Sequence, residues 1–226
     1  MPADLWSQFD AAPLALTLRV ASVATLLALL LGVALGWVFA RTRLPGRSVL
    51  EAVCMLPLVL PPTVLGYGIL VLMGRRSVLG GWLREHFDYT VIFHWHGAVI
   101  TSALAALPFV IKGSSTAFAQ VDRHLEAAAR TLGQTGWSTF VRVTLPLAWP
   151  GILAGTLLAF ARAMGEFGAS LMVAGSIPGQ TQTVAMAIYD AVQAGNDTLA
   201  QTLVVIISLV SVAFLVLSNR FLQRRP

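Results

Sequence analysis

Long apolar stretches alternate with short polar connections along most of the chain. Each stretch contains enough residues, at about 1.5 Å of helical rise per residue, to cross about 30 Å of hydrocarbon. We therefore predict an all-α integral membrane protein with five membrane-spanning helices, organised as a single domain over residues 1–226. The predicted spans are residues 14–40, 50–73, 97–118, 147–173 and 198–219.

The composition supports a membrane protein and excludes two other classes of protein. Hydrophobic residues make up 57% of the chain and charged residues only 11%, whereas an ordinary soluble domain is about 25% charged. So few charges exclude both a disordered chain and a soluble enzyme with a large external domain. The net charge of +5 arises from arginines that flank the apolar stretches, which indicates membrane topology and not nucleic-acid binding.

Arginines fall unequally on the two sides of the predicted spans. If the N-terminus lies outside, nine arginines lie on the inner segments and three on the outer ones, so the positive-inside rule predicts an outer N-terminus and an inner C-terminus. A sixth span at residues 181–194 would reverse the C-terminus, but this polar segment is too short, and we expect a short helix at the outer mouth. The inner arginines are Arg41, Arg43, Arg47, Arg123, Arg130, Arg142, Arg220, Arg224 and Arg225, and the outer ones are Arg75, Arg76 and Arg84.

Prolines interrupt the second predicted span at Pro57, Pro61 and Pro62. A proline removes a helical hydrogen bond, and the backbone groups that it frees inside a membrane must be satisfied by protein or by a wet cavity. The prolines are therefore explained either by a simple kink or by a helix that lines a pathway. On the second interpretation Pro61, Pro62 and Gly66 are candidate pathway or gate residues.

The fourth predicted span contains a carboxylate, Glu166, in an otherwise apolar segment. A charge inside a membrane is costly and usually faces the protein interior, and Arg162 lies four residues earlier on the same helical face. We predict an ion pair between them that serves structure or gating, in preference to a substrate ligand. Gly165 and Gly168 flank the carboxylate and permit close helix approach, so Gly168 joins Arg162 and Glu166 as a pathway candidate.

The sequence offers no catalytic set and no metal site. His94 and His96 flank a tryptophan at an outer boundary, which is typical of an interfacial belt and a weak ligand set for a metal. Arg19 and Lys112 lie near span ends, where they can extend to the membrane surface or meet an anion. The chain also lacks a phosphate-binding glycine-rich loop, so a function driven by ATP requires a partner.

The inner connection at residues 119–146 predicts a short amphipathic helix. Asp122 is a plausible N-cap, the helix is expected over 123–132, and Gly133 suits the position after its end. A second short helical stretch is expected over 137–143. Such a helix can insert into a groove on a partner or lie on the lipid surface; it lacks large aromatic anchors in its first turns, which favours the partner. Its apolar face consists of Leu125, Ala128, Ala129 and Leu132.

This connection resembles the EAA loop of bacterial ABC importer permeases. That pattern is Glu-Ala-Ala, three residues, Gly, nine residues and then Ile-x-Leu-Pro; here the triplet position holds alanines, with Glu126 one residue earlier. Gly133, Val143, Leu145 and Pro146 fall in register. The resemblance implies that the residues coupling to an ATPase are Leu125, Glu126, Ala127, Ala128, Ala129, Leu132, Gly133, Leu145 and Pro146.

The likeness extends over about residues 14–219. The segments RLPGR, LPLVLPPTVLGYGILVLMGRR, LEAAARTLG and ARAMGEFGA resemble the molybdate permease subunits of that superfamily, with tungstate and sulfate permeases as close relatives. This implies the type I ABC importer permease (MetI-like) architecture in a bacterial inner membrane. The implied role is to translocate an oxyanion by alternating access, and molybdate is the expected substrate.

The resemblance also implies the partners. These are a second copy of the chain, cytoplasmic ABC ATPase subunits that bind ATP and Mg, a periplasmic oxyanion-binding protein and membrane lipid. The chain itself is then not an enzyme and binds no cofactor. The rival hypotheses are a secondary transporter coupled to an ion gradient and an intramembrane enzyme, but Glu166 is the only mid-span carboxylate and no inverted repeat is apparent.

Overall fold

The computed structural model describes residues 10–42 and 45–223, with side chains as far as residue 220, and contains helices but no strand in these ranges. Arg43, Arg224 and Arg225, which enter the arginine count, lie outside the described residues. The helices are α2 (Ala12–Arg41), α3 (Arg47–Val59), α4 (Pro62–Met73), α5 (Val78–Phe87), α6 (Trp95–Gln120), α7 (Arg123–Thr131), α8 (Gly136–Thr139), the π-helix η1 (Phe140–Thr144), α9 (Leu145–Met164), α10 (Gly168–Ala174), α11 (Val184–Gln193) and α12 (Asp197–Gln223).

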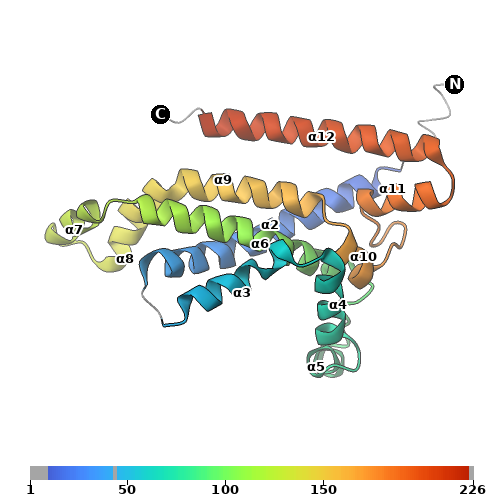
Figure 1. Ribbon diagram of the computed structural model, residues 1–226, viewed down its shortest axis with the longest axis horizontal. Coiled ribbons are helices and arrows are strands. Elements are labelled where there is room, and N and C mark those ends of the chain that lie inside the picture. Colours follow the sequence, from blue (N-terminus) through green and yellow to red (C-terminus); the bar gives the residue numbers. More distant parts are fainter. Residues whose placement is uncertain (1–9, 43–44, 224–226) are drawn as a thin grey trace.

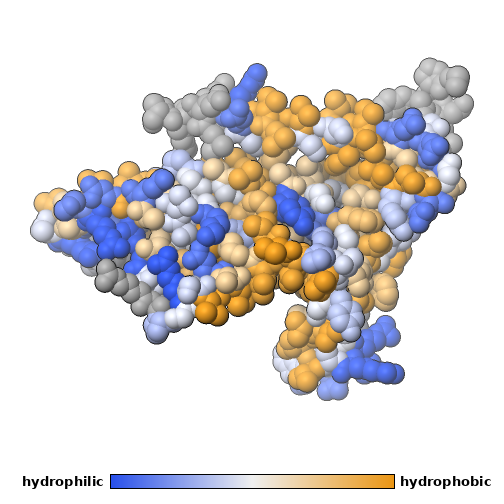
Figure 2. Space-filling model, viewed as in Figure 1, coloured by the Kyte–Doolittle hydropathy of each residue, from blue (hydrophilic) through white to orange (hydrophobic). Residues whose placement is uncertain are grey.

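Three long helices, α2, α6 and α9, pack side by side and form the centre of the molecule (Figure 1). Helix α12 runs along one edge, while α4 and α5 project from the opposite side. Helices α7 and α8 lie at one end of the bundle, and α10 and α11 lie at the other. Hydrophobic residues cover much of the middle of this face, and hydrophilic residues gather at the end that holds α7 and α8 (Figure 2).

Four helical runs within the described ranges are long and apolar enough to cross a membrane, and the bent pair of α3 and α4 can provide a fifth crossing. This arrangement confirms the predicted all-α membrane protein. The runs are Ala12–Arg41, Trp95–Gln120, Gly136–Met164 and Asp197–Arg220. As expected, the segment at 181–194 forms a short helix, α11, and α5 is an additional short helix that the sequence pattern did not predict.

The predicted span over residues 50–73 is interrupted, as its prolines indicated, and the interruption is sharper than a simple kink. Helices α3 and α4 meet at an angle of 112° at a break over Leu60 and Pro61, which we call the first break. Leu60 has ψ 140° and Pro61 has ψ 138°, because each residue precedes a proline whose ring disfavours the α conformation. Pro62 then begins α4, where its fixed φ suits the first helical turn.

The single helix predicted over residues 147–173 was wrong. Helix α9 ends at Met164, and α10 begins at Gly168 after a second break over residues 165–167. The Glu166 carboxylate accepts a hydrogen bond from the backbone N–H of Ala169 (3.1 Å) and so caps the new helix. Apart from Arg162 and Glu166 the segment is apolar, so its hydropathy alone does not mark the interruption.

Small residues allow the central helices to approach closely. A Cβ atom added at Gly36 of α2 would lie 2.6 Å from Cβ of Ser114 in α6, and one at Gly32 would lie 2.7 Å from Cβ of Val110. On the other side of α6, a Cβ atom at Gly113 would lie 2.8 Å from Cα of Gly155 in α9. Close backbone packing of this kind is a main source of helix association in membranes, where water does not drive it.

Substitution at Gly36 tests this packing. The Gly36→Ala variant forces α2 away from α6, and overpacking typically costs about 1–3 kcal/mol, so its unfolding temperature in detergent should fall. The matched control is Gly68→Ala in α4, where an added Cβ atom meets nothing within 4 Å. Equal unfolding temperatures for the two variants would contradict the proposed role of the glycine.

Candidate functional site

The short helix α7 is fixed at both ends by local hydrogen bonds. The Asp122 carboxylate accepts a hydrogen bond from the backbone N–H of His124 (2.8 Å), as predicted for an N-cap. At the other end Gly133 adopts φ +83°, and the backbone N–H groups of Gly133 and Gln134 bond to the carbonyls of Arg130 and Ala129. This is the Schellman arrangement that favours glycine, so the predicted helix and its end are confirmed.

The apolar face of α7 is largely exposed. No residue of α7 is buried, and Leu125 is 49% exposed, while Leu132 just after the helix is 82% exposed. Ala127 and Ala128 are exposed and Ala129 is half-buried. Exposed leucines at the ends of a small-residue face form a surface suited to contact with another protein.

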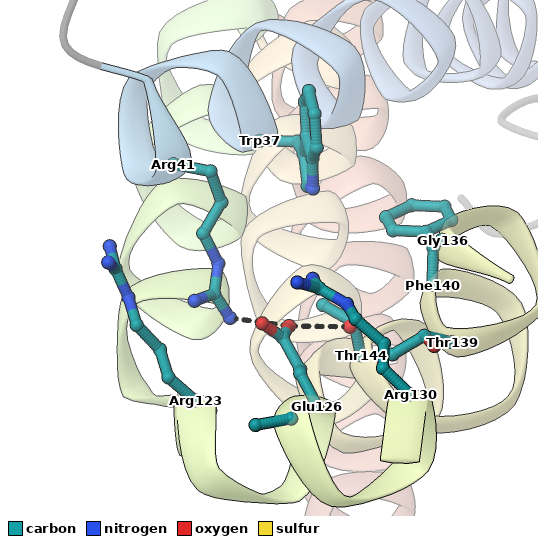
Figure 3. A pocket seen from close by; sticks show the side chains of 10 residues that line it. Trp37, Arg41, Arg123, Glu126, Arg130, Gly136, Thr139, Phe140 and Thr144 are labelled. Carbon is teal, nitrogen blue, oxygen red and sulfur yellow. Dashed lines mark hydrogen bonds and ion pairs between the residues drawn. The ribbon is translucent and has the colours of Figure 1, made fainter. Parts of the chain in front are cut away.

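The opposite side of α7 is held against the membrane helices through Glu126. Its carboxylate forms an ion pair with Arg41 at the end of α2 (2.9 Å) and accepts a hydrogen bond from Thr144 Oγ1 in η1 (2.6 Å) (Figure 3). The Glu126 and Arg41 side chains are only 13% and 11% exposed, so solvent screens the pair weakly. We call these three residues the Glu126 anchor.

A π-helical turn positions Thr144 in this anchor. The backbone N–H of Leu145 bonds to the carbonyl of Phe140, five residues earlier, and the turn lies directly before Pro146, which has no N–H to donate. Thr144 is buried, and the half-buried Leu145 packs against the core cluster that contains Phe118, whereas Pro146 is exposed. Leu145 and Pro146 therefore begin α9 and do not belong to the exposed face of α7.

The predicted ion pair between Arg162 and Glu166 is present, with Nη1 and Oε2 2.8 Å apart. Glu166 is 3% exposed and lies in the second break, not in a continuous helix as the sequence suggested. Its carboxylate serves both the arginine and the N-terminus of α10, so the break and the charge pair form one structural unit.

The two helix breaks lie against each other. A Cβ atom at Gly66 of α4 would lie 3.0 Å from Cα of Ala169 in α10, and one at Gly168 would lie 3.1 Å from Cβ of Pro62. Pro61 lies exposed at the first break. The structure thus brings the pathway candidates of α4 and α10 together beside the Arg162–Glu166 pair.

The remaining polar candidates have other partners. The Arg19 guanidinium lies over the Trp95 ring, 4.0 Å from its centroid, and Lys112 Nζ pairs with Glu51 at 2.6 Å. Sequence reasoning did not identify Arg41 and Thr144 as functional. Arg41 entered only the arginine count, and no local pattern signals a contact between residues 85 positions apart.

Breaking the Glu126 anchor should release α7. The Glu126→Gln variant leaves the weakly exposed Arg41 without its counter-charge, and breaking a buried pair costs about 3–5 kcal/mol. Trypsin should therefore cut the purified variant faster after Arg123 and Arg130 than it cuts the unmodified chain. The control is Glu51→Gln, which removes a more exposed pair with Lys112. Identical cleavage rates for the two variants would show that the Glu126 anchor does not hold α7 in place.

Residues 14–225 match the family described as binding-protein-dependent transport system inner membrane component. A putative molybdenum transport system permease protein of Bacillus subtilis is 42% identical over 211 residues, 93% of each chain. A molybdenum transport system permease protein of Escherichia coli is 42% identical over 203 residues, 89% of each chain. A sulfate transport system permease protein of Synechococcus elongatus is 38% identical over 89% of this chain and 70% of its own length.

Solved ABC transporters share the fold. An inward-facing MetNI methionine transporter matches with a TM-score of 0.71 and 19% identity over 93% of each chain. A bacterial alginate transporter in complex with an alginate-bound periplasmic protein matches with a TM-score of 0.76 and 15% identity, over 96% of this chain and 80% of the other. These likenesses confirm the predicted importer permease architecture. The chain therefore belongs to the family of binding-protein-dependent transport system inner membrane components, as a multi-pass permease of the inner membrane.

Proposed function

We propose that this chain is the membrane subunit of an ATP-driven importer that carries molybdate into the cell by alternating access. The two molybdenum transport relatives match nearly end to end, whereas the sulfate transport relative is less identical and longer, which favours molybdate over sulfate. Tungstate has the same charge and tetrahedral shape, and it is the alternative substrate.

The observation that carries the coupling proposal is the difference between the two sides of α7. One side is fixed to α2 and η1 through Glu126, and the other presents Leu125, Ala128 and Leu132 to its surroundings. A helix that is rigidly attached on one side and apolar on the other suits docking into a groove of a cytoplasmic ABC ATPase. ATP and Mg are then bound by that partner, because the permease is not itself catalytic.

The proposed assembly contains two copies of the chain, with the N-terminus outside and the C-terminus inside. A periplasmic oxyanion-binding protein delivers its cargo at the end that holds α10 and α11. The two breaks then form the candidate gate, because short helices joined by irregular segments rearrange more easily than continuous ones. Arg162 neutralises Glu166 there, so that the buried carboxylate does not repel an anion passing nearby.

In this proposal, ATP binding brings the two ATPase subunits together and draws the two α7 helices with them. Because the Glu126 anchor joins α7 to the ends of α2 and α9, these membrane helices follow, and the pathway opens toward the outside. Hydrolysis and release return it to the inward-facing state. A secondary transporter, in contrast, would carry molybdate without an ATPase as long as an ion gradient is present.

The volume of the side chain at position 128 tests the docking. Ala128→Trp should overfill the groove and abolish both ATPase binding and ATP-dependent molybdate uptake in reconstituted vesicles, while Ala128→Ser should retain both. The unfolding temperature of the isolated permease should not change, because Ala128 is exposed. Normal ATPase binding and uptake by the tryptophan variant would show that α7 is not the docking element.

A further inference from the structure

A basic pocket lies between α7 and the end of α2, and the proposed function uses only the Glu126 anchor in its wall. The cavity has a volume of about 350 Å³, and its lining includes three arginines, Arg41, Arg123 and Arg130, but one carboxylate, Glu126 (Figure 3). That carboxylate is already engaged by Arg41 and Thr144. The pocket therefore carries excess positive charge.

The arginines have bonding capacity to spare. Arg123 and Arg130 are exposed, and neither forms an ion pair with any acidic side chain that the structure describes. The buried Nε of Arg41 likewise has no hydrogen-bond partner among the described residues. Guanidinium groups bind phosphate oxygens through paired N–H donors, so the pocket matches a phosphate group.

An apolar groove adjoins this pocket. It has a volume of about 420 Å³, and it shares Trp37, Gly136 and Phe140 with the basic pocket. The groove continues along α2 at Val33 and is lined on the other side by Trp137, which is 75% exposed. The two cavities therefore form one amphipathic site, with a cationic end and a hydrocarbon end.

The site lies where a membrane helix reaches the bilayer surface. Helix α2 is a candidate span that ends at Arg41, and the groove follows its last turns within the apolar run. Tryptophans such as Trp37 and Trp137 are typical of the boundary between hydrocarbon and headgroups. A free oxyanion would use the basic end alone, whereas a phospholipid matches both ends.

We propose that an anionic phospholipid of the cytoplasmic leaflet binds here. Its phosphate lies among Arg41, Arg123 and Arg130, and an acyl chain lies in the groove against Trp37 and Phe140. The lipid thereby links α7 to α2 beside the Glu126 anchor. Only the choice of leaflet depends on the orientation proposed above; the binding itself does not depend on transport.

The test is native mass spectrometry of the purified full-length chain in detergent, titrated with phosphatidylglycerol or phosphatidylcholine of identical acyl chains. Phosphatidylglycerol should bind more tightly. The double variant Arg123→Gln/Arg130→Gln should lose about thirtyfold in affinity for it, because each arginine near an anionic headgroup contributes about 1 kcal/mol. Its affinity for phosphatidylcholine, whose choline offsets the charge of the phosphate, should fall much less.

Two further variants separate the parts of the site. Arg75→Gln/Arg76→Gln removes two exposed arginines between α4 and α5, and this control should keep the preference for phosphatidylglycerol. Trp137→Ala shortens the apolar wall and should weaken the binding of both lipids.

Three results would overturn the proposal. The first is an unchanged preference for phosphatidylglycerol in the Arg123→Gln/Arg130→Gln variant. The second is displacement of phosphatidylglycerol by an equal concentration of inorganic phosphate or molybdate, which would indicate a site for free anions. The third is the absence of lipid preference in the unmodified chain. The assay uses neither ATPase nor transport, so its failure would leave the proposed function standing.

Discussion

The ion pair between Glu126 and Arg41 determines how the end of this permease that carries α7 is held together. Helix α7 has nine residues and none of them is buried, so neither its length nor hydrophobic packing fixes it in place. Its caps define where it begins and ends, but they do not attach it to the bundle. The attachment comes from one carboxylate that contacts the end of α2 and the π-turn before α9.

The rest of the molecule consists of a rigid part and an interrupted part. Helices α2, α6 and α9 are packed through small residues whose backbones lie close together, and such packing resists relative movement. The interruptions are confined to the segments around Pro61 and Glu166, which lie in contact through α4 and α10. A movement applied at α7 would therefore move α2 and α9 together. The two breaks are the places where the helices can change their relative orientation.

The sequence predicts those features that depend on neighbouring residues. The α7 helix, its Asp122 cap, its Gly133 end and the Arg162–Glu166 pair all rest on contacts within a few residues, and all were predicted. The angle at Pro61 could not be predicted, because prolines exclude a straight helix without fixing the direction in which the chain continues.

Longer-range contacts were missed for other reasons. The Glu126–Arg41 contact joins residues 85 positions apart, and an arginine after a membrane span is already explained by topology. The second break was missed because the four-residue spacing of Arg162 and Glu166 also fits an ion pair on one continuous helix; in the structure Glu166 additionally caps α10. The close packing did leave a signal in the spacing of Gly32 and Gly36, which lie one helical turn apart.

In the proposed mechanism, the Glu126 anchor transmits movement from the ATPase to the membrane helices. The most direct measurement is the amount of molybdate transported per ATP hydrolysed by vesicles that contain the permease, its ATPase and its binding protein. We predict that Glu126→Gln still binds the ATPase, because the variant keeps the apolar residues of α7 and loses only their attachment to α2 and η1, but that this ratio falls severalfold. An unchanged ratio in the Glu126→Gln complex would contradict this role of the anchor in coupling.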